Sequence, residues 1–262
     1  MGLDNKTITT LGDELYGAWR DARQISPVTE REPGITIDEA YRVQLRTIER
    51  RLGDGEHVVG KKIGITAKAV MQMLGVDQPD FGHLLSGMTY NEGEPLDSSR
   101  FCQPRGEGEI AFILGKDLTG PGIKGPDVLA ATECLMPAFE IVDSRVTDWK
   151  IKIQDTVADN ASAAAFVLGD TAVSARGVDL ANCGMVLEKN GEIIGTGAGA
   201  ASLGNPVNAV AWLANTLGEL GIGLKAGEVI LSGSLSIMFP IQAGDVLRMS
   251  LNGIGNVSCR FT

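Results

Sequence analysis

The stretch RGEGEIAFIL at residues 105–114 places two acidic side chains directly before an apolar run that is typical of a buried β-strand. Side chains alternate between the two faces of a strand, so Glu107 and Glu109 are expected to point the same way. Adjacent carboxylates repel each other, and burying them is costly unless a cation neutralises them. Taken alone, this pair favours a solvated acidic strand start, and a second group of residues is needed to indicate a site.

A third carboxylate, Glu140, lies inside the apolar stretch PAFEIVDSR at residues 137–145. Alternation along a strand could leave it exposed, but the run is apolar on both sides of it, and a buried acid needs a partner. Glu107, Glu109 and Glu140 together could hold a hard divalent cation. The chain has only two histidines, so Mg²⁺ or Mn²⁺ is favoured over zinc.

Other polar residues interrupt or follow apolar segments elsewhere in the chain. The stretch VGKKIGIT at residues 59–66 carries adjacent lysines, which face opposite sides of a strand. Only one of them can point inward, where it could enter a pocket, or both could reach solvent. Asp80 in QPDFG is either a turn residue or a general base. The stretch ending at Ser162 could cap a helix or line a site.

Composition excludes several classes of function. The chain has 262 residues, 44% of them hydrophobic, which suffices for a sizeable core. Its formal net charge of −10 argues against binding to nucleic acid and against docking on anionic membranes. No apolar run reaches the roughly 20 residues that cross a bilayer, and no signal peptide is recognisable, so we expect a cytoplasmic protein. Four widely spaced cysteines are expected to be reduced and partly buried.

The first 75 residues read as mainly helical. Leu11, Leu15 and Trp19 recur at helical spacing, and Thr36 with Glu39 forms a capping box that begins a second helix. The apolar side chains expected along that second helix are Tyr41, Leu45 and Ile48. A third helix is expected over residues 66–74, with Gly75 ending it.

From about residue 100 the pattern indicates strands with a few helices. Runs at residues 110–114, 164–168 and 229–231 are strand-like, and residues 246–249 and 256–259 could form a closing hairpin. Asn190-Gly191 indicates a hairpin turn. Helices are expected over residues 126–134 and after Asn205-Pro206, where Asn205 is the cap. The glycines of residues 195–201 indicate close backbone packing and no phosphate loop.

Six segments, GKKIGIT, QPDFG, RGEGEIAFIL, PAFEIVDSR, IQDTVADNAS and ILSGS, make the chain resemble the bacterial 2-hydroxypenta-2,4-dienoate hydratases. These belong to the hydratase/decarboxylase family of the fumarylacetoacetase-like superfamily and act in the meta-cleavage degradation of aromatic compounds. The resemblance covers almost the whole chain. It implies an α+β fold, a mixed β-sandwich roll like the fumarylacetoacetase C-terminal domain, with a smaller N-terminal α/β part. We expect residues 1–76 to form that part, residues 77–262 to form the catalytic domain, and the chain to form a homo-oligomer.

The resemblance also implies the site. It places Mg²⁺ or Mn²⁺ on Glu107, Glu109 and Glu140, gives catalytic roles to Lys62 and Asp80, and makes Ser162 face the substrate, a small 2-hydroxydienoate or 2-oxo acid. The implied reaction is hydration of 2-hydroxypenta-2,4-dienoate to 4-hydroxy-2-oxopentanoate.

Two alternatives remain open at this point. One is the sister activity of a 4-oxalocrotonate decarboxylase, and the other is a non-catalytic partner in a complex with such a decarboxylase. Asp80 favours the hydratase, because water addition needs an acid–base group more than decarboxylation does.

Overall fold

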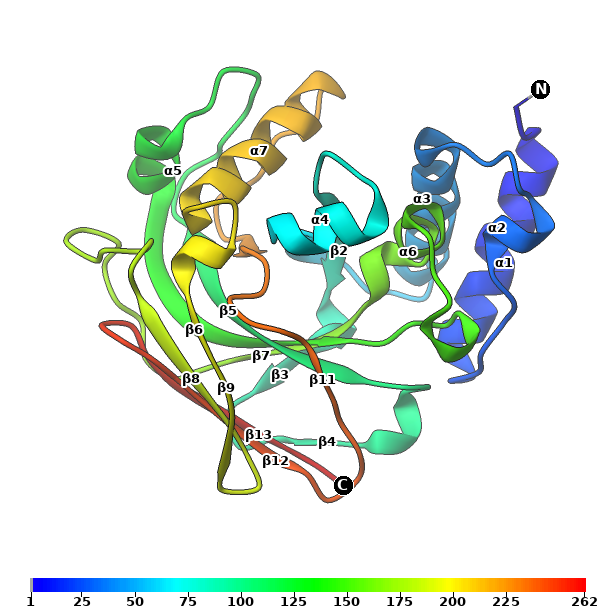
Figure 1. Cartoon of the computed structure of the whole chain (residues 1–262). Coiled ribbons are helices and arrows are strands. Elements are labelled where there is room, and N and C mark those ends of the chain that lie inside the picture. The colour runs from blue at the N-terminus through cyan, green and yellow to red at the C-terminus, as the bar shows by residue number, and fades with distance from the viewer. Residues whose placement is uncertain (1) are drawn as a thin grey trace.

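A sheet of eight strands forms the centre of the molecule in the computed structural model, which describes residues 2–262 (Figure 1). Its strand order is β2-β1-β10-β5-β6-β7-β3, and β11 pairs with β5. The longest strands, β5 and β6, are antiparallel neighbours. The bounds of these eight strands are β1 Val58–Gly64, β2 Asp80–Leu85, β3 Thr89–Asn91, β5 Arg105–Leu114, β6 Thr132–Val142, β7 Ala163–Leu168, β10 Val229–Leu231 and β11 Phe239–Pro240.

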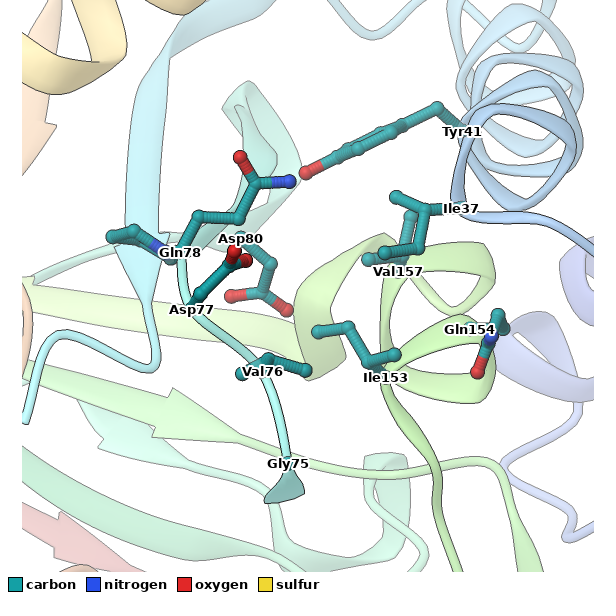
Figure 2. Close-up of a pocket in the computed structure, with 11 residues that line it drawn as sticks. Ile37, Tyr41, Gly75, Val76, Asp77, Gln78, Asp80, Ile153, Gln154 and Val157 are labelled. Carbon is teal, nitrogen blue, oxygen red and sulfur yellow. The ribbon is translucent and has the colours of Figure 1, made fainter. Parts of the chain in front are cut away.

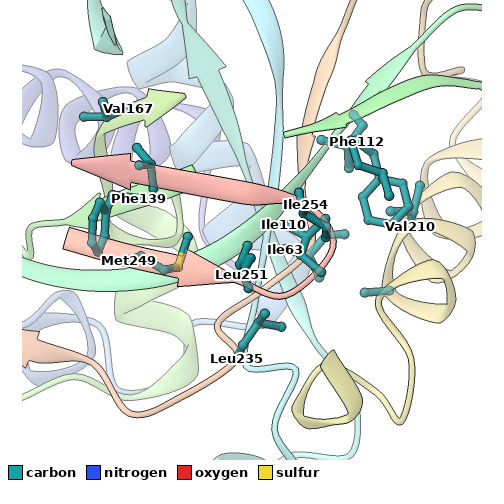
Figure 3. Packing of buried hydrophobic residues seen from close by; sticks show 14 of the residues in the cluster. Ile63, Ile110, Phe112, Phe139, Val167, Val210, Leu235, Met249, Leu251 and Ile254 are labelled. Carbon is teal, nitrogen blue, oxygen red and sulfur yellow. The ribbon is translucent and has the colours of Figure 1, made fainter. Parts of the chain in front are cut away.

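A second sheet of five strands packs against one face of the large sheet and closes the sandwich. Its order is β4-β13-β12-β8-β9, and the Asn190-Gly191 turn joins β8 to β9 as expected. Phe139 from the large sheet and Met249 from the second sheet lie in the shared hydrophobic core (Figure 3). The strand bounds are β4 Pro95–Leu96, β8 Gly184–Lys189, β9 Glu192–Ala198, β12 Val246–Leu251 and β13 Gly255–Phe261.

The N-terminal helices α1 (Asn5–Arg20), α2 (Val28–Arg31) and α3 (Ile37–Gly53) lie at one end of the large sheet together with α6 (Ile153–Ala158) (Figure 1). The capping box at Thr36 is confirmed: its hydroxyl accepts a hydrogen bond from Glu39 N. The expected apolar face of α3 is partly wrong, because Leu45 is 49% exposed. Gln44 is buried instead, and its amide donates to the carbonyls of Phe81 and Val157.

The remaining helices are α4 (Lys68–Leu74), α5 (Gly125–Ala131) and α7 (Pro206–Glu219). Gly75 ends α4 with a φ of 67°, and the Asn205 side chain caps α7, as expected. The helix expected over residues 126–134 is too long. Residues from Thr132 onward belong to β6 and pair with β5, because strand pairing outweighs local helical preference there.

The expected architecture is present: two packed sheets form a mixed β-sandwich, and the N-terminal helices pack together at one end of it. The division at residues 76/77 stays a prediction; β1, which precedes it, pairs with β10 inside the large sheet. Within residues 2–262 no helix combines the length and apolarity that a membrane span requires. All four cysteines are free thiols, and Cys183 and Cys259 are buried.

Candidate active site

Three carboxylates meet on the face of the large sheet that points away from the second sheet. Glu107 and Glu109 alternate with Gly108 on β5, and the strand register sets Glu140 of β6 directly opposite Glu107. Directly opposed residues point to the same face, so all three side chains project together. One carboxylate oxygen from each residue lies within 4.8 Å of the others. The structure therefore brings together the three acids that the sequence singled out.

Burial leaves several oxygens of these acids without a partner. Glu109 and Glu140 are completely buried, and Glu107 is partly exposed. Glu109 Oε2 accepts a hydrogen bond of 2.7 Å from Gly233 N, but Glu109 Oε1 and both oxygens of Glu140 have no hydrogen-bond partner. Buried oxygens without donors are costly, and a hard divalent cation would satisfy them. The donor set thus fits Mg²⁺ or Mn²⁺.

The same burial shifts the pKa values of all three groups. It raises the pKa of Glu109 well above the usual range, and the charges of Glu140 and Glu107 add to this effect. It raises the pKa of the less buried Glu107 to about 7, against the opposing charge of Lys62. Burial also raises the pKa of Glu140, again opposed by Lys62. A dication would reverse these shifts, because it favours the ionised form.

Lys62 supplies a cation on the same face. Its Nζ lies 3.3 Å from Glu140 Oε1 and donates a hydrogen bond of 3.1 Å to the carbonyl of Ala161. Burial disfavours the charged ammonium, but the surrounding acids, led by Glu140, outweigh this and raise the pKa of Lys62. Lys62 therefore keeps its proton. Lys61 faces the other side and is also buried, where its Nζ pairs with Glu228 at 3.2 Å.

Asp80 is the first residue of β2, and the register places it opposite Gly64 on β1. A Cβ at position 64 would overlap Asp80 Oδ1 and would lie 3.2 Å from Lys62 Nζ, so only glycine leaves room for this acid beside the lysine. Asp80 is 2% exposed, and its Oδ1 has no hydrogen-bond partner. Burial raises the pKa of Asp80, while Lys62 opposes the shift.

Ser162 lies in a single 3₁₀ turn, Asn160–Ser162, that closes over the sheet face. Glycine at position 82 lets this turn approach β2, because a Cβ there would overlap the carbonyl of Asn160. The Asn160 side chain accepts a hydrogen bond from His83 N and donates one to the His83 carbonyl. The Ser162 hydroxyl lies 3.3 Å from that of Thr156. Three consecutive residues with positive φ shape the turn.

A cavity of about 480 Å³ opens over these groups and is called the front cavity below. Its lining includes Lys62, Asp80, Glu107 and Ser162. Sequence reasoning missed two lining residues, Arg105 and Trp149. The Arg105 guanidinium lies 4.5 Å from the centre of the Trp149 ring and has no ion-pair partner within residues 2–262. The sequence could have indicated Arg105, because residues two apart on a strand share a face and Arg105 precedes Glu107 by two. Nothing in the sequence indicated Trp149.

Comparisons with known proteins agree with this geometry. Residues 75–262 match the family described as fumarylacetoacetate (FAA) hydrolase C-terminal. A 2-hydroxypent-2,4-dienoate hydratase of Pseudomonas putida is 62% identical over 221 residues, which cover 84% of this chain and 100% of that protein. A 2-hydroxyhexa-2,4-dienoate hydratase of Comamonas testosteroni is 52% identical over 261 residues, covering 99% of each.

Among solved structures, 4-oxalocrotonate decarboxylase from Pseudomonas putida G7, complexed with magnesium and adipate, superposes with a TM-score of 0.96. It is 36% identical to this chain, and the match covers 99% of both chains.

Proposed function

This chain belongs to the fumarylacetoacetate hydrolase family, and from that membership we propose that it is a hydratase that converts 2-hydroxypenta-2,4-dienoate to 4-hydroxy-2-oxopentanoate. The observation that carries the proposal is the convergence of Glu107, Glu109, Glu140, Lys62 and Asp80 on one face of one sheet. The 62% identity to a protein named for this reaction supports the choice of substrate.

The reaction has two steps, ketonisation of the dienol and then addition of water. In the first, the C2 hydroxyl loses a proton and C5 gains one, which gives an α,β-unsaturated 2-oxo acid. In the second, the oxygen of water bonds to C4 and a proton is added to C3. Both steps place negative charge on the C2 oxygen, so groups that stabilise that charge accelerate them.

The three glutamates are the proposed ligands of a divalent cation, Mg²⁺ or Mn²⁺, which would supply Lewis-acid stabilisation of the C2 oxygen when bound. Lys62, which keeps its proton, orients the anionic substrate through its positive charge. Asp80, whose pKa is raised by burial, accepts and returns the proton that water addition requires. Ser162 donates to a substrate oxygen from the turn above. Arg105, unpaired at the front cavity, matches a substrate that carries a carboxylate.

Decarboxylation of 2-oxo-3-hexenedioate is the second candidate function, because the similarity to the decarboxylase structure extends over the whole chain. It needs the same charge stabilisation at C2 but no water. The expected homo-oligomer, a complex with a related decarboxylase and a cytoplasmic location stay predictions.

A two-substrate assay separates the candidates. The purified protein is given 2-hydroxypenta-2,4-dienoate or 2-oxo-3-hexenedioate with Mg²⁺ or Mn²⁺, and again with EDTA. Metal-dependent formation of 4-hydroxy-2-oxopentanoate, followed by NMR, is the expected result. Release of CO₂ from the second substrate without hydration of the first would contradict it.

A matched pair of variants ties the activity to the site. Glu140→Gln removes a buried acid of β6 and is expected to abolish hydration. Glu133→Gln makes the same chemical change at an exposed position of the same strand and should leave the rate unchanged. Equal rates in both variants would remove Glu140 from the proposed site.

A further inference from the structure

A second cavity of about 270 Å³ lies beside the front cavity, and Asp80 is the one residue that lines both. We call it the rear cavity. Figure 2 shows Tyr41 entering it from α3 and Ile153 and Val157 from α6, facing the loop that leads to Asp80. Asp80 therefore separates the proposed substrate site from a space with no assigned role.

The polar groups of the rear cavity suit water. Tyr41 stacks on Phe81 with ring centroids 4.4 Å apart, and its hydroxyl accepts a hydrogen bond of 3.2 Å from Phe81 N. That hydroxyl donates to no acceptor among residues 2–262, so its proton is free for a water molecule. Burial raises the pKa of Tyr41, which keeps this proton in place. Gln78 and the carboxylate of Asp80 supply further hydrogen-bonding groups on the cavity lining.

The size of the cavity is also suitable. A water molecule occupies roughly 30 Å³ in the liquid and needs two to four polar partners when it is buried. A volume of about 270 Å³ therefore accommodates several waters, and five polar side chains line it: Tyr41, Asp77, Gln78, Asp80 and Gln154. Ile153 and Val157 form an apolar wall opposite the loop of residues 75–80, so Asp77, Gln78 and Asp80 place polar groups along one side of the cavity.

Hydration consumes one water per turnover while the substrate fills the front cavity. We propose that the rear cavity stores the reacting water and delivers it past Asp80, with the Tyr41 hydroxyl as a positioning group. This inference rests on the proposed function, because a decarboxylase has no need of such a store. The delivered water gives its proton to Asp80 as its oxygen bonds to C4, and Asp80 returns a proton to C3.

Neighbouring residues offer a matched test, since Ile153 lines the rear cavity and Ile151 lines the front cavity. Ile153→Phe fills the water store, and Ile151→Phe narrows the substrate site. Each variant receives 2-hydroxypenta-2,4-dienoate with Mn²⁺. NMR then measures the ratio of the hydrated product to the ketonised but unhydrated 2-oxo acid. A merely structural defect lowers both products together and leaves this ratio unchanged.

We expect Ile153→Phe to lower the ratio of hydrated to ketonised product by about tenfold or more with little change in KM, because the reacting water is displaced. Ile151→Phe should raise KM and keep the ratio. An unchanged ratio in Ile153→Phe, or a raised KM that shows substrate entering the rear cavity, would overturn the inference.

Tyr41→Phe provides an independent variant if Ile153→Phe does not fold. It keeps the ring on Phe81 and removes only the hydroxyl. We expect the ratio of hydrated to ketonised product to fall, but by less than in Ile153→Phe. A wild-type protein that ketonises without hydrating would contradict the proposed function itself. A hydrating wild type with an unshifted Tyr41→Phe ratio would contradict only the water store.

Discussion

Replacing Glu109 by glutamine is expected to stabilise the metal-free protein, although the residue is completely buried in the large sheet. Glu109 Oε2 accepts from Gly233 N, and its other oxygen has no partner. The glutamine amide keeps the acceptor for Gly233 and adds a donor that can reach the neighbouring carboxylates. The change therefore turns a repulsive contact into a hydrogen bond.

The magnitude follows from the raised pKa values. The pKa of Glu107 rises from 4.5 to about 7 on folding. Below pH 4.5 this shift costs nothing, because both states are protonated; as the pH rises toward 7 the unfolded chain releases its proton first and stability falls. At one pKa unit per about 1.4 kcal/mol, the cost at pH 7 is about 3 kcal/mol. Burial raises the pKa of Glu109 as well, so its charge destabilises the metal-free fold in the same direction.

We therefore expect Glu109→Gln to raise the free energy of unfolding of the metal-free protein by about 2–3 kcal/mol, or the melting temperature by about 5–10 °C. Bound metal should stabilise the wild type more than the variant. A ligand at one hundred times its dissociation constant stabilises by about 2.7 kcal/mol. Wild type is expected to gain that amount with Mn²⁺, and the variant, which lacks one carboxylate ligand, is expected to gain much less.

Calorimetry at pH 7.5 with EDTA and with Mn²⁺ measures both effects. Glu133→Gln, the exposed control on β6, should melt within about 2 °C of wild type under both conditions. A metal-free Glu109→Gln protein that melts below wild type would refute the reasoning about buried charge. An unchanged Mn²⁺-induced shift in that variant would refute the assignment of Glu109 as a metal ligand.

Three further predictions follow from other parts of the structure. Asp80→Asn should lower turnover by about 10²–10⁴-fold while calorimetric Mn²⁺ binding persists; unchanged turnover would exclude an acid–base role. Arg145→Met should cost about 3–5 kcal/mol in chemical unfolding, because it leaves Asp159, paired at 2.6 Å, buried without a cation. Burial, together with the charge of Lys61, lowers the pKa of His83 to about 3. Neutral His83 therefore leaves the fold at full stability above pH 6.5, and stability is lost as the pH falls from 6.5 toward 3. His83→Gln should lose less melting temperature between pH 6.5 and 5 than wild type does.

Local signals predicted much of the fold. The capping box at Thr36, the Asn190-Gly191 turn and the Asn205 cap each depend on residues close in sequence, and all three are confirmed. The predictions failed where contacts with residues far away in the sequence determine which side chains are buried. Leu45 was assigned to the core by spacing alone, but α3 is rotated so that Gln44 reaches carbonyls of β2 and α6. No local pattern around Gln44 reveals partners 37 and 113 residues away.

The site was predictable as a set of residues but not as an arrangement. Alternation predicted that Glu107 and Glu109 share a face. The pairing of Glu107 with Glu140 depends on the register of β5 and β6, which their sequences do not specify. Lys62 and Asp80 reach the site because β1 and β2 join the same sheet beyond β10, a topology without a short-range signal. The resemblance to a known family supplied what spacing could not.

Folding alone does not explain the placement of these acids. On the same face of β5 and β6, the positions beside them are filled by Ala111 and Ala138, which need no partner. Apolar side chains in place of a buried ionic cluster are often neutral or stabilising, and like charges set directly opposite each other, as Glu107 and Glu140 are, destabilise a sheet. One ammonium cannot neutralise these three acids and Asp80 together. A divalent cation would remove most of the remaining repulsion and satisfy the unpaired oxygens, and this is the physical reason for proposing a metal at this cluster.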